Sequence, residues 1–594
     1  MQINQKKEIM KKLMLIIVLG MYGCTLPQML KMATQQKLTV VPNPLEAHKD
    51  TVQFDFSATL PVNMMKKGTI YTLNSFYKYG DKELALPGIV FKGDDYSVSQ
   101  TPPQVTKTLS FPYQPEHKIG TLEIEGVAQK GTKTKTTPRL QVATGVITTS
   151  KLVQKSYYVA FAPHGYNNQE EIIPVVIPDF SFDQGSSVLK KAEVKSPKGE
   201  QLDAFIASKN ITRSVTIVGT HSPEGRERIN NKLSEERAQA IEKFYRSTMK
   251  KYDYAKVADS INFVLKPIVD DWSGFKVALG GYEGITAEQK SELLDVVNGE
   301  GTFVEQEKQL EKLPSYKKIY KEIYPGLRSA KTEILTIKKK KSDDEIFNLS
   351  KLISQGNASA DTLSLEELLY GATLTPVLEE KIAIYQAATN KATNWEAHNN
   401  LGATYLQQAI NNPSGSSDLI DKASAQFELA AKIRNTSEVN ANLATIALMQ
   451  GNPYKASSLA SKALNGANND VSRGVNGVKG SSEIYMAKYQ EAVNSETSAK
   501  NTDLNLFNKG LAQILTKDYE NASSSFNEAV SLNSNLAVAY YGLAIVAART
   551  DKADEVVSNL TKAVSENPDL KQMALSDLEF SKYSATDAFK NALK

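Results

Sequence analysis

The stretch GLAQILTKDYENASSSFNEA, residues 510–529, and the stretch AIVAARTDKADEVVSNLTKA, residues 544–563, decide the fold of the C-terminal part of this chain. They align without a gap at a displacement of 34 residues, so that Phe526 matches Leu560. In each stretch small residues recur where two helices would touch, and larger ones fill the adjacent gaps. A repeat of this length predicts helix pairs that stack on one another.

Earlier copies of the same pattern extend this region toward the N-terminus. Matching residues are Leu401, Gly402, Tyr405, Ala423, Phe427, Ala430, Leu443, Ala444, Ala447, Ala456, Ala460 and Ala463. The pattern resembles the tetratricopeptide repeat (TPR) family from roughly Glu366 to Leu570, with about five units. We expect an all-α TPR solenoid over residues 342–594, in which the residues named form the core. The resemblance implies a concave groove that binds a protein partner.

Length and composition predict several domains in a water-soluble body. The chain has 594 residues, 41% of them hydrophobic and 23% charged, with a formal net charge of +4. A single hydrophobic core does not extend over such a length, so the protein is multi-domain. The nearly balanced charge forms no basic stripe, and the one dense run, Lys338 to Lys341, lies at an expected junction. Nucleic acid is therefore not an expected partner.

The N-terminus has the pattern of an export signal. A lysine-rich start is followed by the apolar run Leu13 to Leu19, which is too short to cross a bilayer, and Gly23 precedes Cys24. Cys24 is the only cysteine, so it forms no internal disulfide, and it resembles the lipidated cysteine of bacterial lipoproteins. That resemblance implies a signal peptide over residues 1–23 and an outer-membrane anchor through acyl chains on Cys24. We expect a tether over residues 24–50.

Residues 51–175 are expected to form a β-sandwich. Apolar and polar residues alternate at Val52, Phe54 and Phe56, as on a strand with one buried face. Turn-forming pairs such as Lys67-Gly68 and Gly80-Asp81 separate short strands. We predict no binding site in this part.

The next region, residues 176–341, predicts alternating strands and helices. Strands are expected around Phe180, over Ser214 to Gly219, and over Asn262 to Lys266. Between the second and third strands the chain reads NNKLSEERA, residues 230–238, and opens a helix. Asn230, Leu233, Ser234, Arg237 and Ala238 match the N-x-x-L-S-x-x-R-A pattern of the OmpA-like domain. The resemblance implies a central α+β OmpA-like domain, with residues 287–324 as a helical insertion and a last strand over Glu333 to Ile337.

An OmpA-like fold implies noncovalent binding of the peptidoglycan stem peptide. Its arginine grips a carboxylate through two parallel hydrogen bonds, and an acidic residue receives the amino group of the same diamino acid. Arg237 matches the first role, and Ser222 stands where wall-binding members have Asp. Glu224 is a candidate to compensate, and Asn230 completes the candidate peptidoglycan-binding set. A second interpretation stays open, in which Arg237 pairs with Glu235 or Glu236 on its own helix.

Catalytic and metal-binding motifs are not found in the sequence. It contains no H-E-x-x-H, C-x-x-C or G-x-S-x-G pattern and no phosphate-binding glycine loop. The histidines are scattered, and His221 is the only one beside the candidate site. The pair Asp270-Asp271 is expected to be a solvated turn. We therefore expect no enzyme activity, no cofactor and no metal site.

Together these features resemble outer-membrane lipoproteins of the Bacteroidota. Thr25 to Gln28, directly after Cys24, contains no acidic residue, which favours the periplasm-facing side of the outer membrane. The first hypothesis is a scaffold that joins this membrane, peptidoglycan and a protein partner. The alternative is an accessory subunit of an outer-membrane secretion, gliding, pilus or protein-insertion machine, in which the OmpA-like domain no longer binds peptidoglycan.

Overall fold

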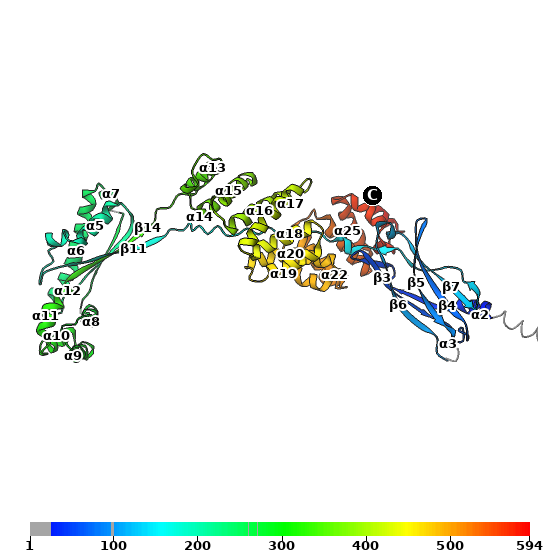
Figure 1. Ribbon diagram of the computed structural model, residues 1–594, viewed down its shortest axis with the longest axis horizontal. Helices are drawn as coiled ribbons and strands as arrows, with labels where there is room; N and C mark the ends of the chain where they lie inside the picture. The colour runs from blue at the N-terminus through cyan, green and yellow to red at the C-terminus, as the bar shows by residue number, and fades with distance from the viewer. Residues whose placement is uncertain (1–24, 97–99, 259, 270) are drawn as a thin grey trace, which may run out of the picture. The chain divides into compact units, whose positions relative to one another are not determined.

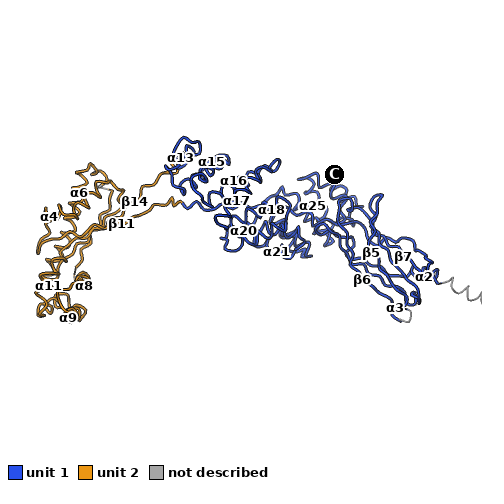
Figure 2. Tube along the Cα trace, viewed as in Figure 1, with its two compact units in different colours: residues 1–165, 346–594 blue, residues 166–345 orange. Residues whose placement is uncertain are grey.

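The computed structural model describes residues 25–594 except 97–99, 259 and 270. The expected signal peptide and Cys24 lie outside the described residues. The chain divides into two compact units (Figure 2). Unit 1 comprises residues 1–165 and 346–594, and unit 2 comprises residues 166–345. No helix in the described part of the chain is long and apolar enough to cross a membrane.

The N-terminal part of unit 1 consists of two sheets (Figure 1). The first has the order β1-β3-β2-β10, with β6 also paired to β3, and its strands are β1 (Lys37–Val41), β2 (Leu45–His48), β3 (Thr51–Thr59), β6 (Gln104–Pro112) and β10 (Val146–Ile147). The second has the order β5-β4-β7-β8, with β9 paired to β7, and its strands are β4 (Ile70–Tyr79), β5 (Lys82–Lys92), β7 (Thr121–Lys130), β8 (Lys133–Thr136) and β9 (Leu140–Thr144).

The two sheets share one hydrophobic core. Phe54 and Phe56 from the first sheet and Tyr71 and Tyr77 from the second are buried in the same cluster. Their alternation with more exposed residues along each strand places one face of each sheet inside. The arrangement is a β-sandwich, in which two half-buried sheets cover each other.

The structure differs from the expected tether over residues 24–50. Residues Thr25–Ala33 form helix α2, and β1 and β2 belong to the first sheet. Leu26, Met29 and Ala33 lie on one face of α2 and are buried in the core of the sandwich. Because this face is apolar at helical spacing, the segment packs on the domain and is not an extended linker.

The C-terminal part of unit 1 is a long solenoid of helices, which fits the TPR pattern predicted from the repeat (Figure 1). Its helices are α13 (Asp343–Ser354), α14 (Leu365–Gly371), α15 (Leu378–Lys391), α16 (Trp395–Asn411), α17 (Ser417–Ile433), α18 (Ser437–Met449), α19 (Pro453–Ala463), α20 (Asn469–Tyr485), α21 (Tyr489–Ser498), α22 (Asp503–Leu515), α23 (Tyr519–Leu532), α24 (Ala537–Arg549), α25 (Ala553–Glu566), α26 (Asp569–Leu575) and α27 (Asp587–Ala592). Successive helices from α16 to α25 pack as pairs. A Cβ on Gly510 would lie 2.9 Å from the ring of Phe526, so the small residue of one helix receives the large residue of the next.

Residues 153–165 do not belong to the sandwich, although they lie within the range 51–175 expected for it. After β10 and the short helix η2 (Thr149–Leu152), this segment has no helix or strand of its own. Its residues Val153, Ala160 and Ala162 are buried in three successive cores of the solenoid. The sequence pattern does not reveal this placement because the helices concerned follow about 240 to 350 positions later.

Unit 2 is built on a four-stranded sheet with the order β11-β14-β12-β13. The strands are β11 (Ile172–Ser181), β12 (Ile211–Gly219), β13 (Asn262–Pro267) and β14 (Ser329–Ile337). β12 and β13 are parallel, and β14 is antiparallel to both β12 and β11. A parallel pair needs a crossover connection, which here holds helix α6 (Glu227–Lys251) and the short helix α7 (Ala255–Ala258).

Two helices supply the other half of the core of unit 2. Helix α5 (Pro197–Ala207) contributes Leu202 and Ile206, and α6 contributes Ile241 and Tyr245. The short helix α4 (Lys191–Val194) precedes α5. Together they bury the apolar side chains of β11, β12 and β14, so unit 2 is an α+β domain.

The helical insertion begins earlier than the sequence pattern indicates. Its helices are α8 (Ser273–Gly280), α9 (Ala287–Asn298), α10 (Phe303–Leu310), α11 (Tyr316–Glu322) and α12 (Tyr324–Leu327). They enclose a separate core that includes Trp272, Phe275, Leu293 and Ile319. The insertion is therefore a compact helical subdomain between β13 and β14.

Candidate functional site

The candidate site lies on the loop that joins β12 to α6 in unit 2. A Cβ on Gly219 would lie 1.9 Å from the carbonyl oxygen of Ser234, so only glycine allows the strand to end this close to the helix. The next residue, Thr220, fixes the loop, because its N–H donates to the Ser329 carbonyl at 2.8 Å and its hydroxyl to the Leu327 carbonyl at 2.7 Å. The loop is thus held against both α6 and the start of β14.

The structure brings the four candidate residues together around one cavity of about 380 Å³. Ser222 and Glu224 come from the loop, and Asn230 and Arg237 come from α6. Residues from the helical insertion, namely Glu311, Tyr316 and Tyr320, also line the cavity. The insertion, for which the sequence indicated no role, therefore completes the candidate site.

Arg237 is 1% exposed and holds three separate backbone segments. Its guanidinium donates to the carbonyls of Thr220 at 2.7 Å, Ser186 at 3.1 Å and Asp183 at 3.3 Å. Burial, and then the charge of Arg328, lower the pKa of Arg237 to about 10. Within the described residues Arg237 forms no ion pair, so the pairing with Glu235 or Glu236 in the second interpretation is not formed.

Glu224 is the acidic residue of the cavity. Its Oε1 accepts hydrogen bonds from the Ser222 hydroxyl at 2.6 Å and from Arg328 at 2.7 Å. Arg328 also donates to Ser222 Oγ at 2.9 Å. The second carboxylate oxygen of Glu224, Oε2, is buried and has no hydrogen-bond partner in the described structure. Ser222 thus positions Glu224 and Arg328 and contributes no charge of its own.

Arg328 is a residue of the site that the sequence did not indicate. It directly precedes β14, about 100 positions after the loop, and its ion pair with Glu224 is nearly buried. The only available indication was a basic residue just before an apolar strand. That pattern is too common to select a site. The partner of Arg328, Glu224, comes close to it only because β12 and β14 are neighbours in the sheet.

Asn230 and His221 stabilise the loop. The Asn230 amide donates to the Glu224 carbonyl at 3.1 Å and so closes the turn at Gly225, whose φ of +106° favours glycine. His221 Nδ1 lies 2.8 Å from the Ser222 carbonyl oxygen, and its ring packs edge-on against Phe303. Both residues support the geometry of the loop.

A buried carboxyl group lies behind the wall formed by the insertion. Glu307 accepts hydrogen bonds from Tyr324 at 2.6 Å and Tyr316 at 2.9 Å. Burial raises the pKa of Glu307 to about 7, although both hydrogen bonds act in the opposite direction. Tyr316 therefore links the cavity to a group that titrates near neutral pH.

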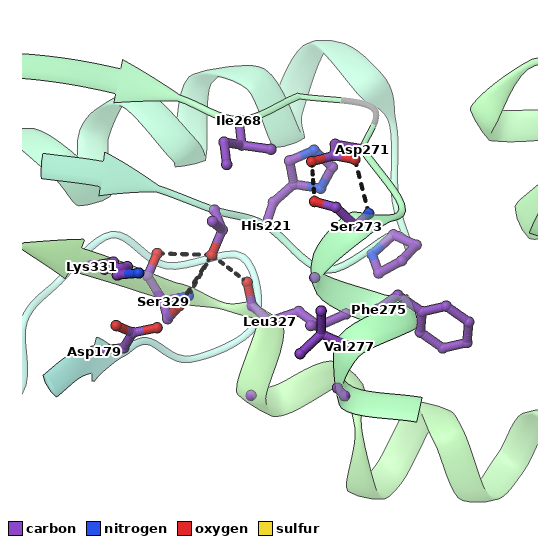
Figure 3. A pocket seen from close by; sticks show the side chains of 15 residues that line it. Asp179, His221, Ile268, Asp271, Ser273, Phe275, Val277, Leu327, Ser329 and Lys331 are labelled. Carbon is purple, nitrogen blue, oxygen red and sulfur yellow. Dashed lines mark hydrogen bonds between the residues drawn. The ribbon is translucent and has the colours of Figure 1, made fainter. Parts of the chain in front are cut away.

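A second cavity of about 530 Å³ is lined by Thr220, His221 and Pro223 of the same loop (Figure 3). Asp179, Asp271 and Lys331 provide charged groups, and residues of α8 such as Phe275 form part of its wall. Asp271 accepts a hydrogen bond from the Ser273 N–H at 2.8 Å, which is the geometry of a turn at the start of a helix. Asp270 lies outside the described residues. Within the described residues no cluster of histidine, cysteine and acidic groups fits a metal ion.

The solved structures that are similar to this chain include several TPR proteins. No family model and no curated protein matches the chain. Similar solved structures include a tetratricopeptide repeat protein from Parabacteroides merdae, 16% identical, covering 43% of this chain and 96% of that one, with a TM-score of 0.24. The C-terminal part of a TPR protein from Cytophaga hutchinsonii is 16% identical and covers 38% and 91%, with a TM-score of 0.28. A thermophilic TPR protein from Thermus thermophilus is 17% identical and covers 30% and 99%, with a TM-score of 0.25.

Proposed function

We propose that this chain is a lipid-anchored, periplasm-facing scaffold of an outer membrane, which binds the peptidoglycan stem peptide in the cavity of unit 2. The observation that carries the proposal is a buried cation and a buried carboxylate oxygen that line the same cavity without being paired to each other. A ligand with both an anionic and a cationic group would complement them. The chain acts by binding and not by catalysis.

The cationic half of the site is Arg237. Its hydrogen bonds go to neutral carbonyl oxygens and its guanidinium lies over the ring of Phe182, and none of these partners carries a formal negative charge. A carboxylate that enters the cavity would accept from the remaining N–H groups of the planar fork. It would also offset the burial that lowers the pKa of Arg237.

The anionic half is Glu224. Because Arg328 and Ser222 both bind Oε1, the carboxylate keeps its orientation and leaves Oε2 for a donor from a ligand. An ammonium group satisfies this oxygen by a charge-assisted hydrogen bond. The diamino acid of the stem peptide carries an amino group and a carboxylate on one short residue, which suits this cavity.

The N-terminal anchor and the solenoid have roles of their own in this proposal. The leader pattern and Cys24 support an acyl anchor, and the TPR solenoid of unit 1 supports a role as a protein-interaction scaffold. Because anchor and wall-binding site are parts of one chain, the second contact is effectively intramolecular and needs only modest affinity.

One observation favours the alternative, an accessory subunit of an outer-membrane machine. The ion pair between Arg328 and Glu224 already neutralises the carboxylate, with 10% and 11% of the two side chains exposed. In that case the loop is a structural platform, and unit 2 contacts protein and not the cell wall.

Co-sedimentation with purified sacculi tests the proposal. The chain should begin at Thr25, because a truncation at Lys37 would remove α2 from the sandwich core. Glu224→Gln keeps the size of the side chain and removes the charge that receives the ammonium group. We expect its affinity for sacculi to fall about 10-fold or more, as for the loss of one charge-assisted hydrogen bond.

The matched control is Glu235→Gln, the same change at an exposed position on α6. It should bind like the unchanged chain. A stem peptide should compete with the sacculi, and the same peptide with its side-chain amine acetylated should not. If the unchanged chain sediments no more than a carrier protein, or if Glu224→Gln binds equally well, the accessory-subunit function replaces wall binding.

A further inference from the structure

Residues 153–162 lie extended along the first helices of four successive repeats in unit 1 (Figure 1). These helices are α22, α20, α18 and α16, and each packs on the next, so that they form one continuous face. The segment meets them in that order and therefore runs antiparallel to the order of the repeats. In a TPR solenoid this is the face expected to receive a partner.

Alternate residues of the segment bind this face through their main chain. The Gln154 N–H donates to Asn508 Oδ1 at 2.9 Å, and Asn508 Nδ2 donates to the Gln154 carbonyl at 2.7 Å. Ala160 makes the same paired contact with Asn442, at 2.8 Å in both directions. An asparagine side chain thus imitates the paired hydrogen bonds of a neighbouring β-strand.

The pairing continues at the other alternate residues. Ala162 binds Asn400, with distances of 2.6 Å from its N–H and 3.0 Å to its carbonyl. The Tyr158 N–H and carbonyl both bind the Thr445 hydroxyl, at 3.3 and 2.7 Å. Contacts at this face are therefore made largely to main-chain N–H and carbonyl groups. Every residue except proline has both.

The polar groups of the face depend on the segment. Asn399, Asn400, Asn442, Thr445, Ser481 and Asn508 are at most 1% exposed. Buried amides and hydroxyls are costly when their hydrogen bonds are not made. These four amides and two hydroxyls are satisfied in part by the main chain of the segment, through its alternating contacts.

One side chain fixes the register. The Tyr158 hydroxyl donates to Asp470 Oδ2 at 2.8 Å, and the Lys500 ammonium lies 4.8 Å from the centre of the Tyr158 ring. Ser156, Ala160 and Ala162 are small and buried, whereas Val153 is buried in a solenoid core and Tyr157 and Val159 pack against two others. The residues of the segment and their alternating spacing therefore fit the polar side chains of the four helices.

We propose that the face formed by α16, α18, α20 and α22 is a receptor for extended main chain, and that residues 153–162 are its resident ligand. While this segment is in place, the face is closed to a partner protein, and a protein partner of the scaffold binds elsewhere. The segment also joins the sandwich to the solenoid along the length of four repeats. This inference does not depend on the binding of peptidoglycan.

Asn400, Asn442 and Asn508 form a ladder of side chains that bind the main chain of the segment. Thiol labelling tests whether this ladder holds the segment on the solenoid. The chain from Thr25 onward has no cysteine, so Ser156→Cys, at a buried position of the segment, adds a single thiol. We expect this thiol to react at least about 10-fold more slowly than a thiol at the exposed Ser534→Cys. Adding Asn442→Leu, which leaves the Ala160 N–H without its partner, should raise the rate at Ser156→Cys about 10-fold or more.

Asn527→Leu is the matched control, since Asn527 is exposed on a second helix and its amide donates within that helix. It should leave the labelling rate unchanged. Equal rates at the Ser156 and Ser534 positions, or no effect of Asn442→Leu, would overturn the proposal. Circular dichroism of each variant shows whether the solenoid remains folded.

Synthetic peptides test recognition through the main chain. In a chain whose residues 153–162 are replaced by glycine and serine, a peptide of residues 152–164 should bind, and it should bind at least about 10-fold more weakly to the unchanged chain. N-methylation at Tyr158, Ala160 and Ala162 should abolish binding, whereas N-methylation at the intervening Tyr157, Val159 and Phe161 should not. Equal binding of the two methylated peptides would contradict recognition by the ladder.

Discussion

At the scale of single residues, the site in unit 2 depends on how the buried polar groups of Arg237 and Glu224 are bound. Arg237 was expected from its motif, and the structure places it in the cavity with hydrogen bonds to three carbonyl oxygens and its guanidinium over the ring of Phe182. Glu224 lies in the same cavity, with one oxygen bound to Arg328 and the other without a partner in the described structure. A sequence motif identifies residues such as Arg237, but their hydrogen-bond partners lie far away in the sequence and are known only from the structure.

Glu307 makes the stability of unit 2 dependent on pH. Its pKa is about 7 in the folded chain against 4.5 as the ordinary value. The protonated form is therefore favoured by folding, so this contribution is fully present below about pH 4.5 and is lost as the pH rises through 7. The difference corresponds to roughly 3 kcal/mol at most.

Glu307→Gln should remove this dependence and leave unit 2 more stable than the unchanged chain at pH 8. The readout is denaturant unfolding followed by Trp272 fluorescence in a Trp395→Phe background, because the chain has two tryptophans and Trp272 lies in the same helical core. Parallel pH profiles of the two proteins would show that Glu307 is not the titrating group.

At the scale of elements, the close approach of β12 to α6 shapes the site. Gly219 ends the strand against the backbone of Ser234, and the loop that follows carries Ser222 and Glu224. Sequence patterns predicted the strand and the helix here within a few residues. They did not predict the wall formed by the helical insertion, because an insertion is positioned only by its packing.

Gly219→Ala should destabilise unit 2 by about 2 kcal/mol or more, because its Cβ meets a backbone atom that moves only with α6. Gly280→Ala is the matched control, since no atom lies within 4 Å of its added Cβ. We expect the control to change the stability by less than about 1 kcal/mol. Unfolding monitored by Trp272 fluorescence measures both, and equal effects would contradict the close approach.

At the scale of the whole molecule, the sandwich and the solenoid form one compact unit. Besides the extended segment, an ion-pair cluster joins them. Arg549 at the end of α24 binds Glu579 in the short helix η5 (Leu578–Phe580) at 2.6 Å and Glu46 in β2 at 3.4 Å. The Thr149 hydroxyl also donates to Glu579.

Arg549→Met should destabilise unit 1 by about 3 to 5 kcal/mol, because it leaves Glu579, whose side chain is 3% exposed, without its cation. Lys582→Met removes a cation from an exposed pair with Asp551 and should lower the unfolding temperature much less than Arg549→Met, because water screens an exposed pair. Thermal unfolding of the chain from Thr25 onward compares the two. Adding Glu579→Gln to Arg549→Met should recover part of the loss, and no recovery would count against a buried unpaired charge.

The sequence by itself determined the local elements of this protein. The 34-residue displacement predicted the TPR solenoid, alternation predicted the strands of the sandwich, and the residues around Arg237 predicted a strand, loop and helix. These properties depend on residues close together in the chain, whose spacing matches the period of a helix or strand. Only the tertiary structure decided that residues 153–162 occupy the inner face of the solenoid, that Arg328 pairs with Glu224, and that α2 belongs to the sandwich. Those contacts join positions that are about 100 to 350 residues apart, and no local pattern encodes which distant group satisfies a buried hydrogen bond.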